Sequence, residues 1–81
     1  MRLLYSERFR KSYDDAPTAI QRAFDRKALF LEQNLTHPSL HAKKYDEHRG
    51  IWQARVTSDW RFYFTIKDDS YTLLDIMKHP K

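Results

Sequence analysis

Two arginines lie inside the most hydrophobic segment of this 81-residue chain, the stretch Ile51–Ile66 with the sequence IWQARVTSDWRFYFTI. The guanidinium group of Arg55 or Arg61 is always charged, and its planar fork binds a phosphate group through paired hydrogen bonds. If the two side chains lie close together, they form a cationic cleft suited to phosphate. The alternative is that each arginine pairs with a carboxylate, such as Asp59 or Asp75, on a solvated surface.

The same stretch predicts two β-strands, Ile51–Thr57 and Trp60–Lys67, because apolar and polar residues alternate along both halves. The alternation produces one apolar face, which consists of Trp52, Ala54, Val56, Trp60, Phe62, Phe64 and Ile66. Both arginines fall on the other face. We therefore expect a hairpin whose apolar face packs against helices and whose second face carries Arg55 and Arg61.

The register of this hairpin follows from the parity of its residue numbers. Directly opposed residues of an antiparallel pair share a face, so even-numbered residues must oppose even-numbered ones. A loop at Thr57–Asp59 satisfies this condition, whereas a turn of only Ser58 and Asp59 would mix the two faces. The expected register places Arg55 opposite Arg61. Opposed like charges cost about 0.2–1 kcal/mol, so a sheet that binds no anion would not favour this register.

The remaining elements must position the hairpin. We predict a strand at Arg2–Ser6, a short helix from the N-cap Ser6 to about Asp15, a long helix at Thr18–Leu35, a possible short strand at Leu40–Asp46 and a last strand at Tyr71–His79. The long helix is indicated by apolar residues that recur at spacings of three and four. The order β-α-α-β-β-β predicts a single α+β domain over residues 1–81, with two helices packed on one face of a mainly antiparallel sheet.

Composition narrows the class of partner. The formal net charge is +4 and the isoelectric point about 9.5, which suits a polyanion such as nucleic acid. Without cysteine the chain has neither disulfides nor a thiolate zinc site, which fits a reducing cytoplasm. No apolar run is long enough to span a membrane, and Met1–Lys11 contains no hydrophobic core of a signal peptide. We therefore expect a cytoplasmic protein that does not bind membranes.

Several short motifs, in this order and spacing, resemble those of a known family. They are HPSL at the end of the long helix, KK on the next strand, W-x-x-R-V and W-R-x-x-F on the hairpin, and a histidine at the end of the last strand. The pattern covers nearly the whole chain and is similar to the RelE/ParE superfamily of toxins from type II toxin–antitoxin modules. It is closer to the RelE-like ribosome-dependent mRNA endonucleases.

The resemblance implies that the 2′-hydroxyl of the message attacks the adjacent phosphate and leaves a 2′,3′-cyclic phosphate. This reaction needs a proton acceptor, cations that stabilise charge on the phosphate, and a proton donor for the leaving oxygen. Arg61 and Arg55 are expected to stabilise charge, because their pKa is too high for proton transfer. His79 is expected to carry protons. Of the adjacent Lys43 and Lys44, only one can reach the cleft, and we expect it to be Lys44.

Further RNA contacts are expected from Lys43, His41, His48, Arg49, Tyr63 and Lys78, each of which could instead be an ordinary surface or packing residue. A metal site is not expected, because Pro38 separates His37 from His41 and no other ligand set is visible. No cofactor is expected. The resemblance implies a cognate antitoxin, the ribosome and mRNA as partners. The alternatives are a ParE-like inhibitor of DNA gyrase and a domain that binds nucleic acid without catalysis.

Overall fold

A computed structural model gives the arrangement of the chain, and the structure describes residues 1–79. The elements are β1 (Arg2–Tyr5), α1 (Glu7–Asp15), α2 (Thr18–Gln33), a short 3₁₀ helix (Pro38–Leu40), β2 (Lys43–Asp46), β3 (Ile51–Arg55), β4 (Trp60–Lys67) and β5 (Ser70–Lys78). The long helix ends earlier than predicted, since Asn34 already has an extended backbone. Within the described residues no helix is long and apolar enough to cross a membrane.

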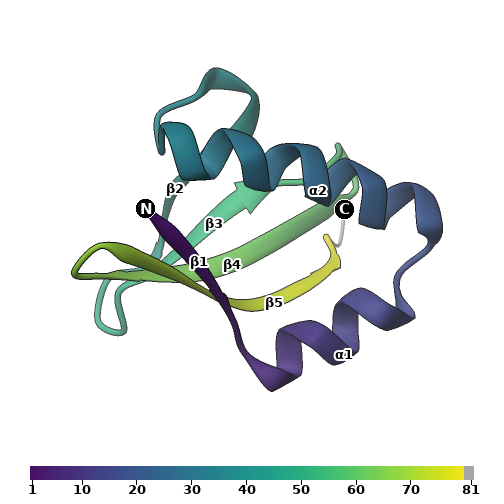
Figure 1. Cartoon of the computed structure of the whole chain (residues 1–81), viewed down its shortest axis with the longest axis horizontal. Coiled ribbons are helices and arrows are strands. Elements are labelled where there is room, and N and C mark those ends of the chain that lie inside the picture. The colour runs from purple at the N-terminus through teal and green to yellow at the C-terminus, as the bar shows by residue number, and fades with distance from the viewer. Residues whose placement is uncertain (80–81) are drawn as a thin grey trace.

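The five strands form one sheet in the order β1-β5-β4-β3-β2 (Figure 1). β1 runs parallel to β5, and every other neighbouring pair is antiparallel. The predicted α+β architecture is therefore confirmed. The short strand that the sequence left open is present as β2, so the observed order contains one strand more than β-α-α-β-β-β.

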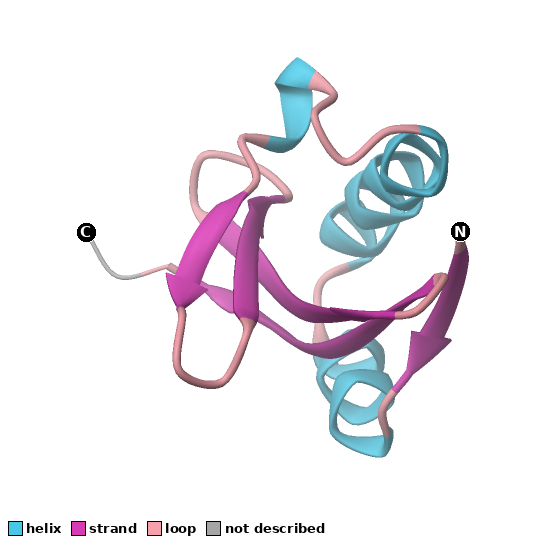
Figure 2. Cartoon of the chain, turned by 90° about the vertical axis from the view of Figure 1, so that its left-hand side faces the viewer, coloured by secondary structure: helices cyan, strands magenta, loops and turns pink. Residues whose placement is uncertain are grey.

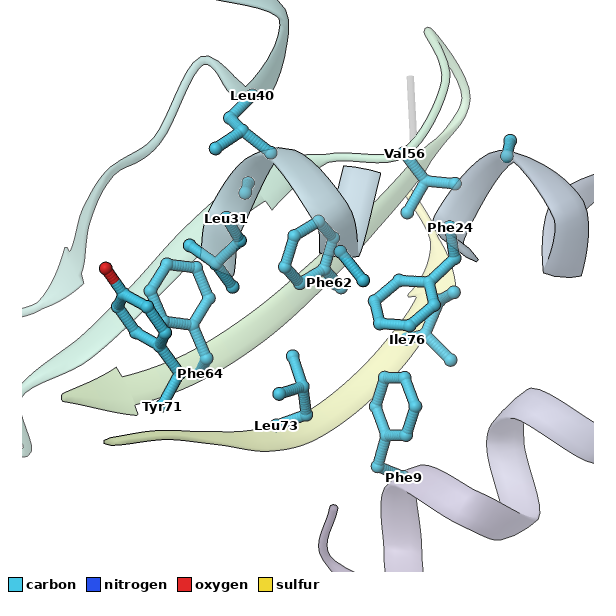
Figure 3. Close-up of a cluster of buried hydrophobic side chains, with 13 residues drawn as sticks. Phe9, Phe24, Leu31, Leu40, Val56, Phe62, Phe64, Tyr71, Leu73 and Ile76 are labelled. Carbon is cyan, nitrogen blue, oxygen red and sulfur yellow. The ribbon is translucent and has the colours of Figure 1, made fainter. Parts of the chain in front are cut away.

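The two helices contribute to a single hydrophobic core. α2 lies across one face of the sheet, while α1 runs beside β5 beyond the end of β1 (Figures 1 and 2). The rings of Phe9 on α1 and Phe24 on α2 are 5.0 Å apart, and Phe24 meets Phe62 of β4 edge-on at 5.1 Å. Figure 3 shows these side chains together with Leu31, Leu40, Val56, Phe64, Tyr71, Leu73 and Ile76. One aromatic cluster therefore joins both helices to the sheet.

Ser6 acts as the N-cap of α1, as predicted, and also anchors the helix to the sheet. Its Oγ accepts a hydrogen bond from the Phe9 backbone N–H at 3.0 Å and donates one to the carbonyl oxygen of Leu74 at 3.1 Å. Replacing Ser6 with alanine should lower the free energy of unfolding by about 1 kcal/mol, because the first turn loses its cap. Urea unfolding would measure this loss. Ser12→Ala, in the middle of the same helix, should cost little, and equal losses in both variants would contradict the capping role.

The β3–β4 hairpin has the register predicted from residue parity. Arg55 lies opposite Arg61, Gln53 opposite Tyr63, and Ala54 opposite Phe62. The backbone N–H of Val56 donates to the Trp60 carbonyl at 2.9 Å, which closes the loop over Thr57–Asp59. Both arginines therefore lie on the sheet face opposite the hydrophobic core. We call this the open face, and it carries Gln53, Arg55, Arg61, Tyr63 and Asp75.

Candidate functional site

Arg61 is held at the hairpin loop by its own side chain. Its Nη1 donates to the carbonyl oxygens of Thr57 at 2.6 Å, Ser58 at 3.1 Å and Trp60 at 3.0 Å. Nη1 supplies only two of the five N–H donors of a guanidinium. The donors of Nε and Nη2 are not used by these bonds. The arrangement fixes the position of the cation and leaves donors that can bind an anion.

His79 reaches the same loop from the end of β5. Its backbone N–H donates to the carbonyl oxygen of Asp59 at 2.6 Å, directly beyond the pairing of Lys78 with Trp60. In the sequence, 17 residues lie between Arg61 and His79, yet both residues bond to the hairpin loop. The hairpin loop is therefore contacted by the side chain of Arg61 and by the backbone of His79.

Arg55 and His79 share an unusual property. Arg55 Nε and His79 Nδ1 are buried atoms with no hydrogen-bond partner among residues 1–79. Buried polar atoms without a partner are rare in folded proteins, and each one requires an explanation such as a bound ligand or water. Both atoms belong to residues that the sequence had nominated for chemistry. Arg55 lies directly opposite Arg61, so its unpartnered Nε is consistent with a site that binds a polar group.

The alternative that Asp75 pairs with one of the two arginines is not what the structure shows. Its Oδ2 lies 3.1 Å from Nε of Arg8, at the start of α1, and its Oδ1 accepts from the Ile76 N–H at 2.9 Å. Asp75 therefore pairs with a cation that is distant in the sequence and not with Arg55 or Arg61. The charge of the two arginines is not neutralised from this side.

Lys27 is a further cation near the site that sequence reasoning missed. Burial lowers the pKa of Lys27 below its ordinary value of 10.5, and the charges of Arg26 and Arg55 lower it further. Its Nζ donates to the carbonyl oxygen of Ser39 at 3.1 Å. The contribution of Arg55 shows that the two cations lie within electrostatic reach of each other. Because Lys27 lies on α2, no strand pattern could have pointed to it.

The expectation that Lys44 reaches the cleft is wrong. Lys44 lies opposite Trp52, and its Nζ sits 5.3 Å from the centre of the indole ring. That indole packs against the hydrophobic core, so Lys44 is on the core side of the sheet. Lys43 lies opposite Gln53 and therefore shares the open face with Tyr63. Of the two lysines, Lys43 is the one that can approach an anion bound at the open face.

Two other residues expected to contact RNA are also on the core side. Lys78 lies opposite Trp60, and Trp60 packs against the hydrophobic core. His41 lines a hollow with His37, Pro38 and Trp52, next to the short 3₁₀ helix. Neither lies on the face that carries Arg55 and Arg61. No group of three or more His, Asp or Glu side chains in residues 1–79 could hold a metal ion.

Tyr63 is on the open face, as expected, and is held in place by two neighbours. Its hydroxyl accepts a hydrogen bond from Gln53 Nε2 at 3.0 Å, and Gln53 itself is buried. The ring of Tyr45 meets it edge-on with the centres 5.0 Å apart. Tyr63 lies two residues from Arg61 along β4, a distance of about 7 Å.

His48 and Arg49 lie in the turn between β2 and β3, at the opposite end of β3 from the hairpin loop. The turn ends at Gly50, whose φ of 66° is in the left-handed region that glycine adopts without strain. Arg49 Nε donates to Asp46 Oδ2 at 2.8 Å, and its backbone N–H donates to Asp46 Oδ1 at 3.2 Å. Part of the Arg49 side chain is therefore already engaged by a carboxylate.

The hydrogen bonds from Arg49 to Asp46 lead to a testable prediction about how stability depends on pH. They lower the pKa of Asp46 below its ordinary value of 3.8, so their contribution to stability is present above that pH. It is lost as the pH falls through the lowered pKa. Carboxyl NMR titration should place the Asp46 midpoint below 3.8, and Arg49→Ala should raise it. An unchanged midpoint in Arg49→Ala would show that the contact is not formed in solution.

Several solved structures with the same fold are toxins. The archaeal RelE–RelB complex from Pyrococcus horikoshii matches with a TM-score of 0.81 and 18% identity, covering 99% of this chain and 96% of that chain. The YoeB/ParE toxin from Agrobacterium tumefaciens matches with a TM-score of 0.80 and 11% identity, covering 99% and 100%. YafQ from E. coli matches with a TM-score of 0.76 and 18% identity, covering 96% and 93%.

Sequence comparison adds nothing to this result, since no family model and no curated protein sequence matches the chain. At identities this low, structural similarity establishes the fold alone. The chain has the fold that the RelE, YoeB and ParE toxins share, and the resemblance inferred from the motifs is confirmed at that level.

Proposed function

We propose that this protein is the toxin of a type II toxin–antitoxin module and that it cleaves mRNA on the ribosome. The observation that carries the proposal is the convergence of Arg61 and His79 on the hairpin loop, with Arg55 opposite Arg61. RNA cleavage by an internal hydroxyl requires cations that stabilise the phosphate and a group that transfers protons, and two opposed arginines and an imidazole supply these groups.

The reaction is a transesterification. The 2′-oxygen forms a bond to phosphorus while the bond to the 5′-oxygen of the next nucleotide breaks, which yields a 2′,3′-cyclic phosphate and a 5′-hydroxyl. One proton leaves the 2′-hydroxyl and one joins the departing oxygen. The imidazole of His79 transfers protons, whereas Arg55 and Arg61 bind the phosphate oxygens as their negative charge increases. This division of roles needs no metal ion.

The proposed partners are a cognate antitoxin and the ribosome with its message. The comparison structures include complexes of RelE with RelB and of YoeB with YefM, and this supports a cognate antitoxin for the present chain. The ribosome would place the message across the open face. A net charge of +4 favours contact with both messenger RNA and ribosomal RNA.

Expression in growing cells, followed by primer extension on a translated message, tests the proposal. We expect growth arrest and new 5′-ends within codons at the ribosomal A site, and co-expression of the antitoxin should suppress both. Untranslated copies of the message should stay intact. A DNA damage response without message cleavage would favour gyrase inhibition instead. Nucleic-acid binding with neither growth arrest nor cleavage would favour a non-catalytic domain.

A further inference from the structure

A hollow of about 470 Å³ lies on the open face, and its volume falls in the range of small-ligand sites. Its walls include Arg8, Tyr45, Arg49, Tyr63, Asp75 and Met77. Met77 lies directly opposite Arg61, and Asp75 directly opposite Tyr63. The hollow therefore continues along the same strands from the arginine site.

Two tyrosines make one wall of the hollow. The ring of Tyr63 is fixed by the Gln53 hydrogen bond at its hydroxyl and by edge-on contact with Tyr45. The Tyr45 side chain is largely accessible, with 59% of its surface exposed. Aromatic rings of this kind bind nucleobases by stacking, which contributes about 1–3 kcal/mol per base in single-stranded complexes. The wall suits a planar base but does not distinguish one base from another.

Asp75 supplies the discriminating group. Its side chain is only 12% exposed; Oδ1 accepts a hydrogen bond from Ile76 N–H, and Oδ2 forms an ion pair with Arg8. A carboxylate oxygen can accept a second bond, so the group has acceptor capacity left toward the hollow. It cannot bind a phosphate, because the two charges repel. Among the groups of RNA that donate to a carboxylate are the exocyclic amino groups of the bases.

We propose that this hollow binds one base of the RNA and selects a base with an exocyclic amino group, adenine, cytosine or guanine, over uracil. Asp75 accepts the hydrogen bond from the amino group, and the two tyrosines hold the ring. The inference rests on the proposed function, because the base belongs to the message that Arg61 engages. Tyr63 and Arg61 are about 7 Å apart along β4, so the selected base lies next to the reacting phosphate.

NMR titration of the ¹⁵N-labelled chain with 2′-deoxy trinucleotides tests the inference directly. The probes differ only in the central base, and they cannot be cleaved because they lack the attacking hydroxyl. At low salt we expect shifts at Tyr45, Tyr63 and Asp75. Binding should be roughly tenfold weaker for the uracil probe, the effect of one lost hydrogen bond to a charged acceptor. Equal affinity for all four probes, or shifts confined to the core side, would overturn the inference.

The variant Asp75→Asn tests the preference for one base over another, and not only the affinity. The asparagine oxygen can still accept the Ile76 N–H bond, whereas its amide nitrogen now donates. Preference should therefore shift toward uracil, whose carbonyl oxygens accept. Asp69→Asn, in the exposed turn before β5, removes the same charge elsewhere and should leave the order of affinities unchanged. Unaltered preference in Asp75→Asn would overturn the assignment of Asp75.

Tyr45→Ala provides a second variant whose side chain is too exposed to endanger the fold, and it should weaken binding of all four probes. If it binds them as the wild type does, the tyrosine wall is not a base site. None of these measurements depends on cleavage. Failure of the wild type to cut a message would therefore refute the proposed function, whereas failure of the titrations would refute the base site alone.

Discussion

Replacing Arg61 with alanine is expected to reduce cleavage of a translated message by on the order of 10²–10³-fold, the usual effect of removing one charge-stabilising donor from a transition state. The guanidinium is already fixed by three backbone carbonyls before any substrate arrives, so it needs no reorganisation during the reaction. Primer extension on the same message, at matched protein levels, measures the change. Thermal unfolding must accompany it, because the substitution also removes bonds that hold the hairpin loop.

Two further variants separate chemistry from folding. Arg61→Lys keeps the charge but loses the planar fork, so it should recover only part of the activity. Arg22→Ala removes an exposed arginine of α2 and lowers the net charge equally, and it should cut as well as the wild type. If Arg61→Ala cuts as well as the wild type, the role of the hairpin in catalysis is refuted. If Arg22→Ala loses as much activity, only the net charge matters.

The hairpin was predictable because its constraints are local. Strict alternation fixed which residues are buried, and parity then fixed the loop length and the pairing of Arg55 with Arg61. Burying an apolar face is worth far more than the cost of opposing two cations. The sequence therefore determined the register even though it created a repulsive pair.

The β2 strand was not predictable in the same way. Its four residues are Lys43–Asp46, with Tyr45 as the one aromatic side chain and no aliphatic ones, so no buried face determines its register. A shift in the pairing between Lys44 and Asp46 complicates it further. Which lysine meets the open face depends on the pairing with β3, and that pairing cannot be read from two adjacent lysines. The choice of Lys44 failed for this reason.

Contacts between segments that are distant in the sequence could not be predicted either. Asp75 was recognised as a carboxylate that could pair with an arginine, but its partner Arg8 belongs to α1, which sits at the edge of β5 only in the folded chain. The effect of Arg55 on Lys27 likewise joins a strand to a helix. A single carboxylate inside the apolar strand Ser70–Lys78 was a usable signal, because a buried charge needs a partner.

Replacing Phe62 with alanine is expected to lower the free energy of unfolding by about 3–5 kcal/mol. The side chain is fully buried and contacts the rings of both Phe24 and Phe64. Small domains have about 0.05–0.15 kcal/mol of stability per residue, or about 4–12 kcal/mol for 81 residues, so the loss is a large share of the total. Urea or thermal unfolding followed by circular dichroism measures it.

The position of Phe62 makes this variant informative about function as well as stability. It lies between Arg61 and Tyr63, so the same strand carries the core on one face and the site on the other. Phe62→Leu should cost less, because it leaves a smaller cavity, and Leu29→Ala should cost little, because Leu29 is 58% exposed on α2. A loss in Phe62→Ala no larger than in Leu29→Ala would contradict the packing. If the variant stays folded at low temperature but cuts no message, the open face depends on the rigidity of the core beneath it.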